Sequence, residues 1–117
     1  MAIIHIENLF LRTIIGINDS EREKKQDVRI NIWMEFDAHK ASTTDNIEDT
    51  LNYRTLTKKT IDLVENSSFY LLEKLCFEIL QLALQSSDLI TWAKVKVEKP
   101  HAIRFADSVS ITFEQKK

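Results

Sequence analysis

A strict alternation of apolar and polar residues in one central stretch constrains the fold of this chain more than any other feature. The stretch is "QDVRINIWMEFD", residues 26–37. Its apolar phase consists of Val28, Ile30, Ile32, Met34 and Phe36. A period of two is typical of a β-strand that buries one face and exposes the other. The chain is therefore predicted to build a sheet with one face in the core.

Three further stretches are predicted to form strands. Residues 3–15 are rich in β-branched and apolar side chains and end at Gly16, a natural turn position. Their alternation slips phase near Asn8, which predicts a β-bulge. Residues 93–98 and 108–113 alternate again. The polar stretch 17–26 is expected to be a loop, and the polar stretch 40–53 a crossing between strand and helix.

The middle of the chain has the spacing of two amphipathic helices, broken near "ENSSF". The first apolar stripe consists of Leu56, Thr60, Leu63 and Val64. The second consists of Leu72, Leu75, Cys76, Ile79, Leu80 and Ala83. Cys76 lies within this stripe and is interpreted as a core residue.

The order of elements is thus β-β-α-α-β-β, which indicates the α+β class. We expect one domain, residues 1–117, with a four-stranded antiparallel sheet and both helices on its apolar face. The chain has one glycine and one proline, which favours long elements over tight loops. Long strands at the edges of a sheet invite pairing, so we expect an oligomer in which the sheets of several subunits close into a ring.

Composition argues against several classes of protein. The net charge of −2 gives no general attraction to nucleic acid or membrane surfaces. No apolar run approaches the roughly 18 residues of a membrane span, and the start "MAIIHIENLF" lacks the features of a signal peptide. A single cysteine fits a reducing compartment, so the protein is expected to be cytoplasmic. His5, His39 and His101 show no metal-ligand spacing, and no phosphate-binding glycine loop is present.

Lys99 is the first candidate for chemistry. It continues the phase of Ala93, Val95 and Val97 and should therefore point inward at the end of a strand. A buried lysine is costly unless it is paired or neutralised, and burial is the usual route to a lysine that exchanges protons near neutral pH. The pattern leaves open a second interpretation, in which the ammonium group reaches solvent at the strand end.

Glu73, Tyr53 and Glu21 are the other candidates. Glu73 falls in the first turn of the second helix, where a carboxylate can bind a guanidine-like pair of N–H groups or simply stabilise the helix terminus. Tyr53 opens the first helix, and its phenol could exchange a proton with a substrate hydroxyl or merely pack. Glu21, in a loop of mixed charge, would by itself be a solvated surface residue. The residue pattern does not decide between these alternatives.

Five motifs, taken together in their order and spacing, resemble the dihydroneopterin aldolase family. They are "LRTIIGI" with Glu21 five residues after Gly16, "QDVRIN", "DTLNYRTLTK", "LLEKL" and "EKPHAIRFADSVSIT". The similarity covers essentially the whole chain. Within the family, "LNYRT", "LLEKL" and "HAIRFADSVS" resemble the branch of dihydroneopterin triphosphate 2′-epimerases in particular.

This resemblance implies the tunnelling fold, in which four β-β-α-α-β-β subunits form a continuous barrel and two such rings stack into an octamer. It implies active sites at subunit interfaces, with no metal and no organic cofactor. Lys99 resembles the catalytic lysine, Tyr53 a tyrosine contributed by a neighbouring subunit, and Glu21 a second active-site carboxylate. Glu73, with Leu72 beside it, resembles the carboxylate that anchors the pterin.

The function that the resemblance implies is retro-aldol chemistry on the side chain of a 7,8-dihydropterin. We favour 2′-epimerisation of dihydroneopterin triphosphate. The alternatives are an aldolase of folate synthesis and a non-catalytic barrel that binds a pterin or purine. Thr50 is expected among the substrate-binding residues.

A triphosphate tail would need cations. His101 and Arg104 lie in the loop before the last strand, and the first predicted helix brings Arg54, Lys58 and Lys59. We expect His101 and Arg104 to contact the substrate. The alternative is that all five are ordinary surface charges.

Overall fold

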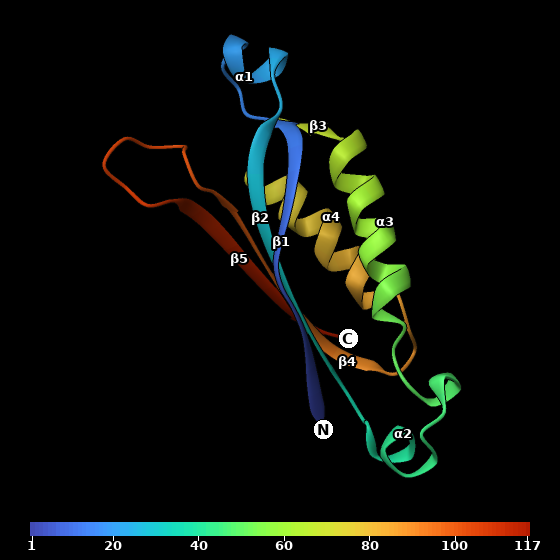
Figure 1. Ribbon diagram of the computed structural model, residues 1–117. Coiled ribbons are helices and arrows are strands. Elements are labelled where there is room, and N and C mark those ends of the chain that lie inside the picture. The colour runs from blue at the N-terminus through green and yellow to red at the C-terminus, as the bar shows by residue number, and fades with distance from the viewer.

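Each alternating stretch of the sequence forms a strand, and the two helical stretches form long helices on one face of the resulting sheet (Figure 1). This computed structural model describes residues 1–117. The strands are β1 (Ala2–Ile15), β2 (Gln26–Phe36), β3 (Ser68–Phe69), β4 (Ile90–Lys99) and β5 (Val109–Lys116). The helices are α1 (Asp19–Glu23), α2 (His39–Thr44), the 3₁₀ helix η1 (Ile47–Asp49), α3 (Tyr53–Asn66) and α4 (Leu72–Leu84).

The sheet has the strand order β3-β1-β2-β4-β5. The four long strands pair antiparallel, which confirms the predicted α+β architecture. The short strand β3 was not predicted. It pairs in parallel with the end of β1, through Ile14 with Ser68 and Ile15 with Phe69. A two-residue strand carries no periodic signal, because only its pairing partner makes it a strand.

The core lies between the sheet and the two long helices. The predicted apolar phase of β2 is buried, from Val28 to Phe36. Helix α3 buries Leu56, Thr60 and Val64, at the spacing expected of one helical face. Each fully buried aliphatic side chain, such as Leu56 or Val64, contributes roughly 1.5–3 kcal/mol to folding.

Cys76 on α4 is a core residue, as predicted. Burial raises the pKa of its thiol to about 11. The thiol therefore stays protonated at neutral pH and is a poor nucleophile.

The predicted bulge in β1 is present. The register between β1 and β2 shifts between Ile6 and Leu9, and Asn8 adopts a left-handed φ of 53°. The side chain of Asn31 holds this bulge: its Oδ1 accepts from the Asn8 N–H at 3.0 Å and its Nδ2 donates to Asn8 Oδ1 at 3.2 Å. Asn31 is buried, although it belongs to the polar phase of β2.

Two segments predicted as irregular contain short helices, which corrects the sequence interpretation. Helix α1 lies within residues 17–26. Helix α2 begins one residue before the stretch 40–53, and η1 lies within that stretch. None of the three has a buried residue, so none has an apolar stripe that a periodicity search can find. Local hydrogen bonds hold them instead. The Glu21 side chain accepts from the Asn18 N–H at 3.3 Å, and Asn46 Oδ1 accepts from the Glu48 N–H at 3.0 Å.

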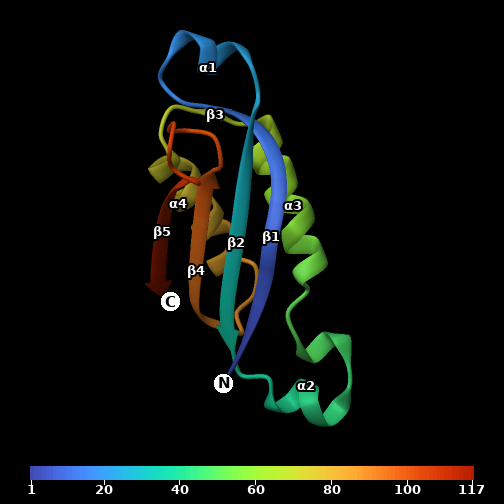
Figure 2. The ribbon, with the colours of Figure 1, turned by 60° about the vertical axis from the view of Figure 1, so that its left-hand side comes forward.

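The molecule is elongated, with extents of 52 × 26 × 20 Å. At one end lie α1, β3 and the end of β4, which we call the α1 end; at the other lie α2, η1 and the start of α3, which we call the α2 end (Figures 1 and 2). None of the helices has both the length and the apolar character that crossing a membrane requires.

Candidate active site

Lys99 and Glu21 form a partly buried ion pair at the α1 end. Lys99 is the last residue of β4 and lies buried on the phase of the core, as the alternation predicted. Its Nζ donates to Glu21 Oε2 at 2.7 Å, and the two side chains are only 11% and 22% exposed. The ammonium group therefore does not extend into solvent, which removes the second interpretation of this lysine.

The Glu21 carboxylate is held by three donors. Besides Lys99, Gln26 Nε2 donates to its Oε2 at 3.0 Å and the Asn18 N–H donates to its Oε1 at 3.3 Å. The hydrogen bond from Lys99, followed by the one from Gln26, lowers the pKa of Glu21 from 4.5 to about 2. Glu21 is therefore ionised at neutral pH and holds the Lys99 ammonium group in place.

Gly16 gives the Glu21 carboxylate its space. Its φ of +132° lies in the region that side-chain-bearing residues rarely adopt. A Cβ at this position would overlap with the carboxyl group of Glu21. The only glycine of the chain is thus part of the site, not merely a turn residue.

The start of α4 lies at the same end of the molecule. Strand β3 pairs with the last residues of β1, and α4 begins at Leu72, three residues after β3 ends (Figure 2). Leu72 packs partly buried against the core, whereas Glu73 is exposed and has no ion-pair partner. The N-cap residue is Leu71, which offers no side-chain acceptor to the first N–H groups of the helix.

Thr50 and Tyr53 lie at the α2 end, so the chain does not bring them to Lys99. Tyr53 is the first residue of α3, and this end of α3 is the one nearer to α2 (Figure 1). The residue is 51% exposed, so packing within this chain does not explain its position. Thr50 lines a cavity of about 500 Å³ together with Asp37, Glu48 and Asp88.

His101 and Arg104 lie in the loop between β4 and β5, directly after Lys99. Both are exposed, and neither forms an ion pair with a carboxylate. The Arg104 guanidinium lies 4.9 Å from the ring centroid of Phe105, which is 96% exposed. Both side chains are therefore free to meet an anion at the α1 end.

The family model that describes dihydroneopterin aldolase, FolB, matches residues 4–114. The chain belongs to the dihydroneopterin aldolase family. The predicted tunnelling fold of this family is confirmed by a crystal structure of Escherichia coli dihydroneopterin aldolase in complex with neopterin. It superimposes with a TM-score of 0.93 at 31% identity and covers 98% of this chain and 99% of that one.

Two relatives are similar in sequence over nearly their whole length. The dihydroneopterin triphosphate 2′-epimerase of Escherichia coli is 50% identical over 111 residues, which span 95% of this chain and 92% of the relative. The epimerase of Pseudomonas aeruginosa is 48% identical over 112 residues, which span 96% of this chain and 90% of the relative.

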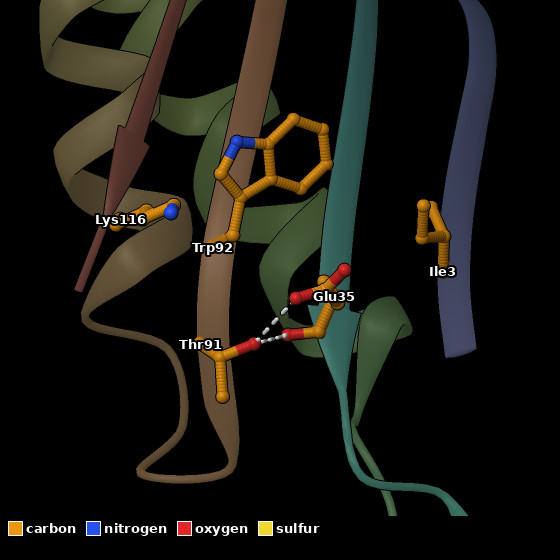
Figure 3. Close-up of a pocket in the computed structure, with 5 residues that line it drawn as sticks. All are labelled: Ile3, Glu35, Thr91, Trp92 and Lys116. Atoms are coloured by element: carbon orange, nitrogen blue, oxygen red, sulfur yellow. Dashed lines mark hydrogen bonds between the residues drawn. The ribbon is translucent and has the colours of Figure 1, made fainter. Parts of the chain in front are cut away.

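A hollow of about 470 Å³ lies on the face of the sheet that carries no helix, but it contains none of these residues (Figure 3). Its lining consists of Ile3, Glu35, Thr91, Trp92 and Lys116. The Thr91 hydroxyl donates to the Glu35 carboxylate at 3.0 Å. These residues come from the start of β1 and β4 and the end of β2 and β5, far along the strands from Lys99. For this member of the family we therefore place the candidate site at the ion pair and not at this hollow.

Sequence reasoning missed two residues that shape the Glu21 environment. Gln26 begins β2 and donates both to Glu21 and, at 2.7 Å, to the Ile15 carbonyl. No feature of the sequence around Gln26 identifies it as a residue of the site. Gly16 was predicted only as a turn, although a lone glycine five residues before Glu21 belongs to one of the motifs that carry the family resemblance.

Proposed function

We propose that this protein is a 7,8-dihydroneopterin triphosphate 2′-epimerase. The observation that carries the proposal is the 50% identity to the Escherichia coli epimerase, against 31% to the Escherichia coli aldolase. The Lys99–Glu21 pair supports it, because it supplies a buried proton donor held in a defined position.

The substrate itself can store the electrons of the reaction. In 7,8-dihydroneopterin the N5=C6 imine adjoins the side-chain carbon C1′. Loss of the 2′-hydroxyl proton lets the C1′–C2′ bond break, and its electron pair enters the ring while N5 takes up a proton. The part of the side chain that begins at C2′ is released as an aldehyde, with C2′ as its carbonyl carbon. If that aldehyde turns over and re-adds to C1′, the configuration at C2′ is inverted.

Each candidate residue has a role in this scheme. Lys99 supplies the proton for the ring nitrogen, and Glu21 keeps its ammonium group oriented. Tyr53 takes the proton of the 2′-hydroxyl. Glu73 binds the amino and ring N–H groups of the pterin with two parallel hydrogen bonds, and Leu72 packs against the ring.

The site is completed by a second copy of the chain, which brings Tyr53 and Thr50 to Lys99. Two observations support this. Tyr53 is exposed at the α2 end, and strand β5 leaves one edge of the sheet without a partner. We propose a homo-octamer of two tetrameric rings, and at least a tetramer at micromolar concentration. An active monomer in sedimentation analysis would contradict this assembly.

The phosphate tail of the substrate lies against the loop that follows Lys99. Exposed His101 and Arg104 have no carboxylate partner, so Arg104 offers positive charge and His101 a ring N–H without first breaking an ion pair. Bare dihydroneopterin has no group that needs this charge.

Dihydroneopterin aldolase is the second candidate. The match to the family model and the 31% identity to the Escherichia coli aldolase favour it. Both reactions share the intermediate, since the aldolase only lets glycolaldehyde leave before it re-adds. A non-catalytic pterin-binding or purine-binding barrel would have no use for a Lys99–Glu21 pair that is largely shielded from solvent.

The test is to incubate the protein with 7,8-dihydroneopterin triphosphate and with 7,8-dihydroneopterin and to resolve the products by chromatography. The proposal predicts the 2′-epimer of the triphosphate as the main product. Faster release of 6-hydroxymethyl-7,8-dihydropterin from the unphosphorylated substrate would establish the aldolase instead. If neither substrate is turned over, the remaining hypothesis is a non-catalytic barrel that binds a pterin or purine.

A further inference from the structure

Arg22 joins two segments of the chain that meet at the α1 end. Its Nη1 donates to the carbonyl oxygens of Gly16 at 3.2 Å and Phe69 at 3.0 Å, and its Nη2 donates to that of Ser68 at 2.7 Å. Its guanidinium also lies 4.1 Å from the ring centroid of Tyr70. It forms no ion pair with a carboxylate. The side chain thus binds backbone on both sides of the junction between α1 and β3.

The two segments that Arg22 joins are both short, and no other side-chain hydrogen bond links α1 to β3. Helix α1 has five residues, none of them buried, and a helix of this length is not stable by itself. Strand β3 has two residues and pairs only with Ile14 and Ile15. In Figures 1 and 2, α1 and β3 lie next to each other at one end of the sheet. Arg22 is therefore a principal contact between them.

Each of the two segments carries part of the candidate site. Glu21 is the residue before Arg22 and holds Lys99. Helix α4, with Leu72 and Glu73 in its first turn, begins three residues after β3 ends. We infer that Arg22 is a positioning residue, which fixes the Lys99–Glu21 pair relative to the carboxylate that anchors the pterin. This inference rests on the proposed function.

An arginine suits this task and a lysine does not. A guanidinium group has donors fixed in one plane, and here two of its nitrogens meet three carbonyl oxygens. The flat face remains free to stack on Tyr70. The ammonium group of a lysine keeps the charge but cannot reproduce the planar fork.

The experiment compares Arg22→Lys and Arg22→Gln with the unmodified protein and with Lys24→Ala. Lys24 is exposed at the end of α1, and its side chain makes no hydrogen bond or ion pair, so it controls for loss of a positive charge. With dihydroneopterin triphosphate, both Arg22 variants should lose roughly ten- to a hundredfold in kcat while KM stays within about threefold. The pterin is still anchored, but the proton donor is misplaced. Lys24→Ala should keep both constants.

Two further measurements need no substrate. In the Arg22 variants, hydrogen exchange should accelerate in residues 17–23 and stay unchanged in α3 and α4. The pKa of Glu21, followed by NMR of a carboxyl-labelled sample, should rise from about 2. If the unmodified protein turns over no pterin, the proposed function fails, and these two measurements still decide whether Arg22 holds α1.

Three results would overturn the inference. Normal kcat in both Arg22 variants would show that the contacts do not position the site. Full activity in Arg22→Lys alone would show that only the charge matters. A uniform rise of exchange across α3 and α4 with a large fall in Tm would make Arg22 a residue of the fold and not of the site.

Discussion

The Lys99–Glu21 pair at the α1 end and Tyr53 at the α2 end differ in how far the chain itself surrounds them. At the α1 end, Lys99 and Glu21 are mostly buried, joined at 2.7 Å, and supported by Gln26 and Gly16. At the α2 end, Tyr53 is 51% exposed, and its phenol has no partner within the chain. The Lys99–Glu21 pair is assembled by the fold of a single subunit, whereas Tyr53 lies at the surface.

A buried lysine and an exposed tyrosine make different demands on the fold of a single subunit. A buried lysine is tolerated only with its partner in place, so the chain must build the ion pair itself. An exposed tyrosine costs nothing to leave at the surface, so a second copy can supply it. Under the proposed function, the two ends are halves of one site that meet between subunits.

Lys99→Ala should have the largest effect. Without the proton donor, turnover should fall by roughly 10²–10⁴-fold while pterin binding changes much less. Steady-state kinetics and a binding titration measure the two quantities. Lys96→Ala, on the same strand but on the opposite phase, is the matched control and should keep its turnover. A Lys99→Ala protein with near-normal turnover would remove the α1 end from the mechanism.

The pH dependence of stability tests whether charge holds the α1 end. The pKa of Glu21 is about 2 in the folded chain, against an ordinary value of 4.5, so the unfolded chain binds the proton first as pH falls. The stabilisation is fully present above pH 4.5 and is lost as pH falls through about 2. The shift corresponds to at most about 3 kcal/mol of folding free energy, and solvent reduces this value because Glu21 is partly exposed. Urea unfolding over this range should show the loss, and Glu21→Gln should lack it. The same slope in both proteins would mean that other carboxylates are responsible.

Arg104→Ala tests whether the α1 end also carries the phosphate contact. KM for dihydroneopterin triphosphate should rise about ten- to a hundredfold, as a charge-assisted contact of about 1.5–3 kcal/mol implies. KM for dihydroneopterin should barely change, and added salt should reduce the difference. Equal losses on both substrates would assign Arg104 to the fold or the pterin pocket. If the unmodified protein showed no preference for the phosphorylated substrate, the aldolase would become the better proposal.

Gly16→Ala and Asp45→Ala compare the effect of backbone strain at the two ends of the molecule. Gly16 has a φ of +132° at the α1 end, and Asp45 has a φ of 56° at the C-terminus of α2. Gly16→Ala should cost about 1–3 kcal/mol of stability and also lower turnover, because the new methyl group displaces Glu21. Asp45→Ala should cost about 1 kcal/mol and leave turnover unchanged. Denaturant unfolding and kinetics separate the two effects, and equal turnover in both variants would contradict the role of Gly16.

The sequence predicts the long elements well, because burial has a period. Alternation identifies β2 and β4, and it places Lys99 on the buried phase of β4. The short elements escape prediction for a physical reason. Helices α1, α2 and η1 depend on local hydrogen bonds of polar residues, and β3 exists only through its pairing with β1. Asn18 three residues before Glu21 is a capping signal that could have revealed α1.

The candidate site was less predictable from residues alone. Lys99 and Glu21 are 78 positions apart, so no local pattern can join them, and only the family resemblance named Glu21. Gln26 and Arg22 contribute through hydrogen bonds to groups elsewhere in the fold, which periodicity does not encode. Tyr53 is the clearest case, since its proposed partner lies on another copy of the chain.

Subunit complementation tests most directly whether the two ends form one site. Lys99→Ala lacks the α1 half and Tyr53→Phe lacks the α2 half, so each variant alone should be nearly inactive. When equal amounts are unfolded and refolded together, random assembly gives one intact interface in four. The mixture should then recover roughly a quarter of the activity of the unmodified protein. Activity no greater than the mean of the two variants would show that Lys99 and Tyr53 do not act together across an interface.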